Sequence, residues 1–123
     1  MVIRRVLAAI KRGETEAKRL IAGALKLIRR AIRDRLLLRI VYDGHERIVE
    51  PHQLVFATDG MPWVDANQTE GGSPWAGAPG PDGVWLRFSL AKIESIELLD
   101  ETCRVRDSFN PDAPVHGRVE ARV

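Results

Sequence analysis

The spacing of hydrophobic positions changes near residue 36, from a helical period to a strand-like one. Before it, apolar residues recur every three or four positions and form one stripe of Ala17, Leu20, Ile21, Ala24, Leu25, Ile28, Ala31 and Ile32. This spacing predicts an amphipathic helix that begins at Glu14 or Thr15 and ends near Arg35. A shorter apolar pattern over residues 2–11 predicts another helical segment, which Gly13 ends.

After residue 36 the chain is rich in β-branched and aromatic residues and is divided by turn residues. Two Asp-Gly pairs, Asp43-Gly44 and Asp59-Gly60, predict tight turns between antiparallel strands. Pro51 predicts a break between two strands, because proline cannot donate to a sheet ladder. The predicted strands cover residues 36–42, 46–50, 53–58, 63–67, 84–89 and 94–99.

Residues 68–83 hold five Gly and three Pro and are predicted to form a loop with Trp75 in its middle. Short antiparallel strands joined by tight turns favour a small closed barrel, because closure removes exposed sheet edges. The predicted class is therefore α+β, with a basic helical segment at 1–35, a barrel at 36–100 and a tail at 101–123. The helix caps one end of the barrel, and the alternating end of the tail pairs with a strand edge.

Composition limits the class of protein. The chain has 123 residues, of which 45% are hydrophobic and 29% charged, and this describes one globular domain. The single Cys103 excludes an internal disulfide and fits a reducing compartment. No apolar run is long enough to span a bilayer, and the first residues lack a secretory apolar stretch. We therefore expect a cytoplasmic protein.

Charge is distributed unevenly. Residues 1–39 contain twelve of the 19 basic residues and only three of the 17 acidic ones. The basic helix either is solvated and packs beside the acidic remainder of a chain, or attracts phosphates of RNA or DNA. Arg29, Arg30 and Arg33 are the candidate nucleic-acid contacts in the second case.

The order of landmarks from Arg39 to Ile93 resembles the WYL domain, a small Sm-like β-barrel of bacterial transcriptional regulators. A strand ending in Tyr42, then Arg47, then Glu50-Pro51, then Asp59-Gly60 and Ala66 follow the family's order. In place of the Trp-Tyr-Leu signature stands Pro62-Trp63-Val64. The closing element keeps its apolar frame of Phe88, Leu90 and Ile93, while Leu86, Ser89 and Ala91 replace polar residues.

The resemblance implies a regulatory domain that senses a nucleotide or single-stranded nucleic acid, in transcription or defence. It implies a ligand site in which Arg47 and Lys92 bind phosphate while Tyr42 and Trp63 stack on a base. The alternative is an assembly module, in which the helical stripe and the tail form a homodimer or bind a partner protein.

No other chemistry is indicated. His45, His52 and His116 have no metal-ligand spacing, so we expect no metal, and His52 is expected in a surface loop. Cys103 has no His-containing signature around it and is expected to be a buried or half-buried small residue rather than a nucleophile. No phosphate loop, dinucleotide fingerprint or nucleophile elbow is present. We expect neither an enzyme nor a cofactor.

Overall fold

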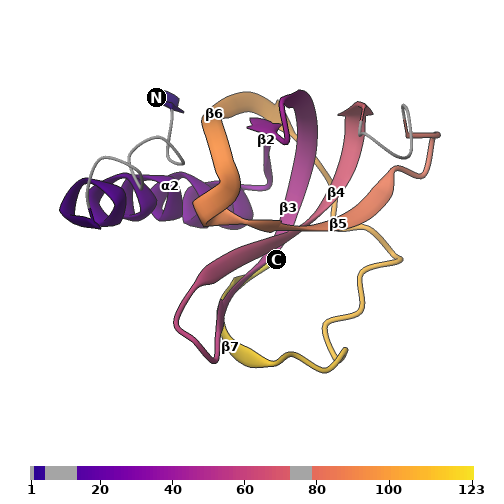
Figure 1. Ribbon diagram of the computed structural model, residues 1–123. Helices are drawn as coiled ribbons and strands as arrows, with labels where there is room; N and C mark the ends of the chain where they lie inside the picture. The colour runs from indigo at the N-terminus through magenta and orange to yellow at the C-terminus, as the bar shows by residue number, and fades with distance from the viewer. Residues whose placement is uncertain (1, 5–13, 73–78) are drawn as a thin grey trace.

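The computed structural model describes residues 2–4, 14–72 and 79–123, and side chains from Lys18 onward. Figure 1 shows an α-helix beside a strongly curved antiparallel sheet. The elements are β1 Val2–Arg4, α2 Glu14–Asp34, β2 Leu36–Tyr42, β3 His45–Ala57, β4 Pro62–Gly71, β5 Val84–Ser89, η1 Leu90–Lys92, β6 Ile93–Thr102 and β7 Gly117–Arg122.

The sheet confirms the α+β class. Within the described residues it has the strand order β1-β6-β2-β3-β4-β5, and β7 pairs with β3 outside this path. The ladders of the described strands leave the sheet open, since none joins β5 to β6 or β1. The closed barrel expected from the sequence is therefore not confirmed.

Strand β3 organises the sheet because it pairs with three neighbours. Its first residues pair with β2 up to Val49, its last ones with β7 from Gln53, and β4 runs along most of its length. The predicted break at Pro51 is wrong. Pro51 lies between the β2 and β7 ladders, next to a register shift, where a missing N–H interrupts neither ladder.

The tight turns are as predicted. Tyr42 pairs with His45, and both residues between them have positive φ, 53° at Asp43 and 74° at Gly44. Two successive positive φ values define a type I′ hairpin, which Asp-Gly favours. Gly60, with φ of 86°, makes the corresponding turn between β3 and β4.

The helical segment predicted for residues 2–11 is wrong for residues 2–4, which the structure describes. Residues Val2–Arg4 form a strand that pairs with β6, with Ile3 opposite Ile96, rather than the start of a helix. A three-residue strand has no periodicity of its own, so the pairing with β6 decides its conformation. The remainder of the predicted segment, residues 5–11, lies outside the described residues, as does Trp75.

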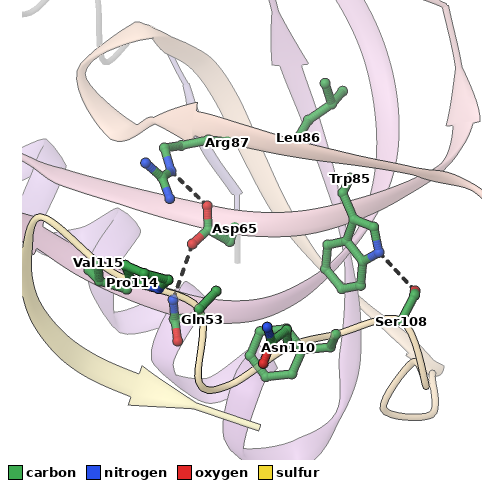
Figure 2. A pocket seen from close by; sticks show the side chains of 11 residues that line it. Gln53, Asp65, Trp85, Leu86, Arg87, Ser108, Asn110, Pro114 and Val115 are labelled. Atoms are coloured by element: carbon green, nitrogen blue, oxygen red, sulfur yellow. Dashed lines mark hydrogen bonds and ion pairs between the residues drawn. The ribbon is translucent and has the colours of Figure 1, made fainter.

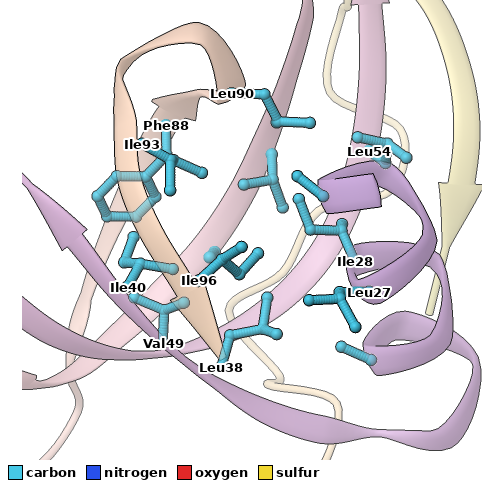
Figure 3. Close-up of a cluster of buried hydrophobic side chains, with 14 of the residues drawn as sticks. Leu27, Ile28, Leu38, Ile40, Val49, Leu54, Phe88, Leu90, Ile93 and Ile96 are labelled. Atoms are coloured by element: carbon cyan, nitrogen blue, oxygen red, sulfur yellow. The ribbon is translucent and has the colours of Figure 1, made fainter. Parts of the chain in front are cut away.

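Helix α2 begins and ends where its apolar stripe predicts, and that stripe packs onto the sheet. Ala24, Leu25, Ile28, Ala31 and Ile32 are all buried in one hydrophobic core together with residues of β2 to β6. Leu27, which the predicted stripe omits, is buried as well. Figure 3 shows α2 directed into this cluster. We call the sheet face that packs against α2 the inner face.

The opposite, outer face is crossed by residues 103–116, which connect β6 to β7 through turns and which we call the strap. Figure 1 shows the strap and α2 on different sides of the sheet. The tail was expected to pair with a strand edge, and β7 does so, with Val119 opposite Val55 of β3. The strap is thereby tied to the sheet at both of its ends.

Candidate functional site

Arg47, the central residue of the predicted ligand site, lies inside the protein, with 1% of its surface exposed. Its Nη1 donates to Gln68 Oε1 at 3.2 Å and its Nη2 to the carbonyl of Tyr42 at 3.1 Å. The guanidinium carbon lies 5.5 Å from the centre of the Tyr42 ring and 5.6 Å from that of Phe88. Among the described residues, Arg47 has no carboxylate partner and its Nε has no hydrogen-bond partner.

The structure brings only two of the four predicted ligand residues together. Tyr42 packs edge-on against Phe88, whose side chain points to the inner face together with Arg47. Trp63 lies on the outer face, where the guanidinium of Arg87 stacks 4.3 Å from its ring centre. Lys92 is exposed in η1. The four side chains therefore do not form one binding surface.

The basic face of α2 is solvent-exposed and partly paired with carboxylates. Arg29 Nη2 lies 2.9 Å from Glu120 of β7, while Arg30 and Arg33 both pair with Asp34. The hydrogen bond from Arg33, with smaller contributions from the charges of Arg33 and Arg30, lowers the pKa of the Asp34 carboxyl. The pair of Arg29 with Glu120 agrees with the expectation that the basic helix packs beside acidic residues of the sheet.

A groove of about 400 Å³ lies on the outer face, between the sheet and the strap. Figure 2 shows its polar wall at Gln53, Asp65 and Arg87, and its aromatic wall at Trp85. The strap forms the other side with Ser108, Phe109, Asn110, Ala113, Pro114 and Val115. Because strands β3, β4 and β5 place Gln53, Asp65 and Arg87 in one row, the sheet fixes these three side chains relative to one another.

The polar wall is a linked set of hydrogen bonds. Asp65 accepts from Gln53 Nε2 at 3.2 Å and from Arg87 Nε at 2.8 Å. Neither Nη nitrogen of Arg87 has a hydrogen-bond partner among the described residues, and the side chain is 52% exposed. Arg87 is thus held in place by Asp65 and Trp63 while its fork remains at the rim of the groove.

The aromatic wall belongs to a cluster of Trp85, Phe109 and His52. The His52 ring meets Trp85 edge-on at 4.8 Å and Phe109 at 5.2 Å, and Trp85 lies 5.9 Å from Phe109. Trp85 Nε1 donates to Ser108 Oγ at 2.9 Å. The expectation that His52 lies in a surface loop is wrong: it is a β3 residue with 0% of its surface exposed.

Cys103 is half-buried, as expected. Burial, with a smaller contribution from the Glu50 carboxylate, raises the pKa of its thiol to about 11. A thiol with that pKa is almost entirely protonated near neutral pH and is a poor nucleophile. The part of the chain that the structure describes contains no cluster of three or more His, Cys, Asp or Glu placed to bind a metal ion.

The sequence analysis missed Gln53, Trp85 and Phe109 as site residues. One signal was present, because strand alternation in residues 84–89 places Trp85 and Arg87 on the face opposite Phe88. No comparable signal marks Phe109, which reaches the groove only because the strap returns across the sheet.

No family model, curated protein or solved structure matches this chain. The WYL-like resemblance stays a prediction made from the residues. In the described portion of the chain, no helix has both the length and the hydropathy of a membrane span.

Proposed function

We propose that this chain is a regulatory ligand-binding module that takes a nucleotide or a short single-stranded nucleic acid in the groove of the outer face. The observation that carries the proposal is the pairing of an aromatic wall, Trp85 and Phe109, with the outward-facing guanidinium of Arg87. Aromatic rings stack on nucleobases, and a guanidinium fork binds phosphate oxygens. The groove thus offers both chemistries that such a ligand requires.

The proposal keeps the function that the WYL resemblance implies and moves the site. Arg47 is enclosed between Tyr42, Phe88 and Gln68, and it does not line the groove of the outer face. Arg47 holds the inner face together, while Arg87 and Trp85 contact the ligand. A Sm-like barrel is the fold that we propose to carry this site, and the strong curvature of the sheet (Figure 1) and the position of η1 between β5 and β6 support it.

The assembly alternative is less well supported. The apolar stripe of α2 is buried in the chain's own core, and β7 pairs with the chain's own β3. Both surfaces that this alternative needs are therefore already covered. Direct binding of nucleic acid by Arg29, Arg30 and Arg33 is kept as a second outcome of the binding experiment, because those side chains are exposed.

The test is fluorescence anisotropy with labelled short single-stranded DNA and RNA at two salt concentrations. Arg87→Ala is compared with Arg19→Ala, a matched arginine on the exposed face of α2. We expect Arg87→Ala to weaken binding and to lower the slope of log K against log salt by about one, while Arg19→Ala does neither. Trp85→Ala removes a stacking surface worth about 1–3 kcal/mol.

Binding that survives Arg87→Ala and Trp85→Ala but disappears in a triple alanine variant of Arg29, Arg30 and Arg33 would assign the activity to the basic helix. Binding lost only in Arg47→Ala, in a protein that circular dichroism shows to be folded, would return the site to the inner face. Either result contradicts the groove.

A further inference from the structure

The strap supplies half of the groove, so the shape of the groove depends on whether the strap is attached. Pro114 and Val115 of the strap line the groove together with the sheet residues Gln53 and Asp65 (Figure 2), and Phe109 lines it as well. Outside the two adjoining strands, a small set of contacts around His52 holds the strap to β3. These contacts determine whether the strap stays attached to β3 when the pH changes.

Arg106 is the strap residue that makes most of these contacts. Its backbone N–H donates to His52 Nε2 at 3.0 Å. Its guanidinium binds both oxygens of Glu50, at 2.7 and 3.2 Å, and this pairing raises the pKa of the guanidinium. Three residues further on, the Phe109 ring packs against the same imidazole. His52 is thus the centre of the attachment.

The hydrogen bonds of His52 define its protonation state. Nε2 accepts from Arg106, so this nitrogen carries no proton, and Nδ1 lies 3.0 Å from the carbonyl oxygen of Glu50, to which it donates. The imidazole is therefore neutral, with both nitrogens in use. A second proton, on Nε2, would set an N–H against the N–H of Arg106 and remove the bond.

The charged groups around the imidazole come from three segments: Glu50 from β3, Arg35 from the turn directly after α2, and Arg106 from the strap. Burial lowers the pKa of His52 most, the two arginines lower it further, and contacts with Glu50 oppose them. When the strap is detached, water reaches the ring and burial no longer acts. The imidazole then binds a proton more readily than in the attached state.

An unpaired polar atom beneath the strap also disfavours the attached state. Gln53 is 5% exposed, and its Oε1 is buried without a hydrogen-bond partner among the described residues. The amide cannot turn over to satisfy it, because Nε2 is fixed by donating to Asp65. An unpaired buried acceptor disfavours the attached arrangement, and detachment of the strap opens Oε1 to water.

We propose that the strap is a pH-sensitive cover of the groove, attached to β3 while His52 is neutral and released when His52 is protonated. The inference rests on the proposed function, because it assigns regulation to that groove. The pKa of the His52 imidazole is lower when the strap is attached than when it is released. Attachment is therefore fully favourable above the ordinary histidine pKa of about 6.5 and weakens as pH falls below that value. Release removes Phe109 from the aromatic wall, so ligand affinity falls in the same direction.

The test uses amide hydrogen exchange measured by NMR on the full chain without ligand. We expect the protection factor of the Arg106 amide, corrected for intrinsic exchange, to fall by up to about tenfold between pH 7.5 and pH 5.5, because a released imidazole with a pKa of about 6.5 is about nine-tenths protonated at the lower pH. The amides of Ile40 and Ile96 in the core should keep their protection. His52→Gln, whose amide oxygen accepts a hydrogen bond but does not titrate, should remove the pH dependence.

The control is His116→Gln, which changes an exposed histidine of the same strap and should leave the pH dependence intact. Equal Arg106 protection at both pH values overturns the proposal, as does a parallel loss at Ile40, which means global unfolding. If His52→Gln does not fold, the NMR titration of His52 in the wild type decides, and an apparent pKa at or above 6.5 overturns the proposal. If the strap opens on acidification but the protein binds no nucleotide, the proposed pH sensitivity of the strap stands and only the proposed function is refuted.

Discussion

Arg47 carries a charged group into the interior with only neutral hydrogen-bond partners among the described residues. Such a group is tolerated because two carbonyl-type oxygens and the faces of Tyr42 and Phe88 replace water around the guanidinium. Gln68, which accepts from Arg47, is itself held in position because its Nε2 donates to the carbonyl of Gly71. One side chain thereby links the end of β2, the start of β3 and the end of β4.

Replacing Arg47 by alanine should destabilise the protein strongly, because it leaves a cavity and two buried oxygens without donors. We expect a loss of about 3 kcal/mol in the free energy of unfolding. Lys92→Ala, the other cationic residue of the predicted ligand site, is exposed and should change it by less than about 0.5 kcal/mol. Urea unfolding followed by circular dichroism measures both, and similar values for the two variants would contradict the burial of Arg47.

Cys103 should react slowly with alkylating reagents. With its pKa raised to about 11, the thiolate is scarce at pH 8, and iodoacetamide should react at least about tenfold more slowly than with free cysteine. The rate should rise with pH as the thiol ionises, and in urea it should reach that of free cysteine. Rapid alkylation of the folded chain at pH 8 would show that Cys103 is not shielded as the structure describes.

At the scale of elements, the spacing of apolar and turn residues predicted those helices and strands whose conformation depends on local interactions. The bounds of β2 and β5 and the extent of α2 follow from periodicity and turn residues. The errors occur where a distant strand decides the conformation. Pro51 continues β3 because it pairs with Ala66 of β4 between the β2 and β7 ladders, and Val2–Arg4 is extended because β6 pairs with it. The burial of Arg47 and the position of Phe109 depend on the whole fold, and so could not be read from sequence spacing.

The junction between the strap and β7 gives a prediction at the same scale. Gly117 has φ of 155°, and a Cβ built on it would lie 2.1 Å from the carbonyl oxygen of Phe56. Gly60 also has positive φ, but a Cβ there would meet nothing within 4 Å. We expect Gly60→Ala to cost about 1 kcal/mol from the backbone conformation alone, and Gly117→Ala to cost more and to expose the amides of β7 to hydrogen exchange.

If the two glycine variants lose equal stability, or if β7 amides stay protected in Gly117→Ala, the close approach of β7 to β3 at Phe56 is not as described. Both glycines have positive φ, 86° at Gly60 and 155° at Gly117, but only Gly117 has backbone atoms against its Cβ position. The comparison therefore tests the contact that joins the C-terminal strand to the sheet.

At the scale of the whole molecule, the sheet separates two tasks. Its inner face holds α2, the hydrophobic core and Arg47, and this side provides stability. Its outer face presents Asp65, Trp85 and Arg87 beneath the strap, and this side holds the candidate site. The sequence analysis found the chemistry of base stacking and phosphate binding but drew its residues from both faces, because a linear pattern does not show which strands share a face.

The central claim is that the ligand site lies in the groove of the outer face. The most direct measurement is an NMR titration of the ¹⁵N-labelled chain with a nucleotide, following the indole N–H of Trp85 and the backbone amides. The account predicts saturable shifts at Trp85, at Ser108, which accepts its hydrogen bond, and at Asp65 and Arg87, with the amides of Tyr42 and Arg47 unchanged. Shifts centred on Tyr42 and Arg47, or no shifts at Trp85 at saturating nucleotide, would contradict it.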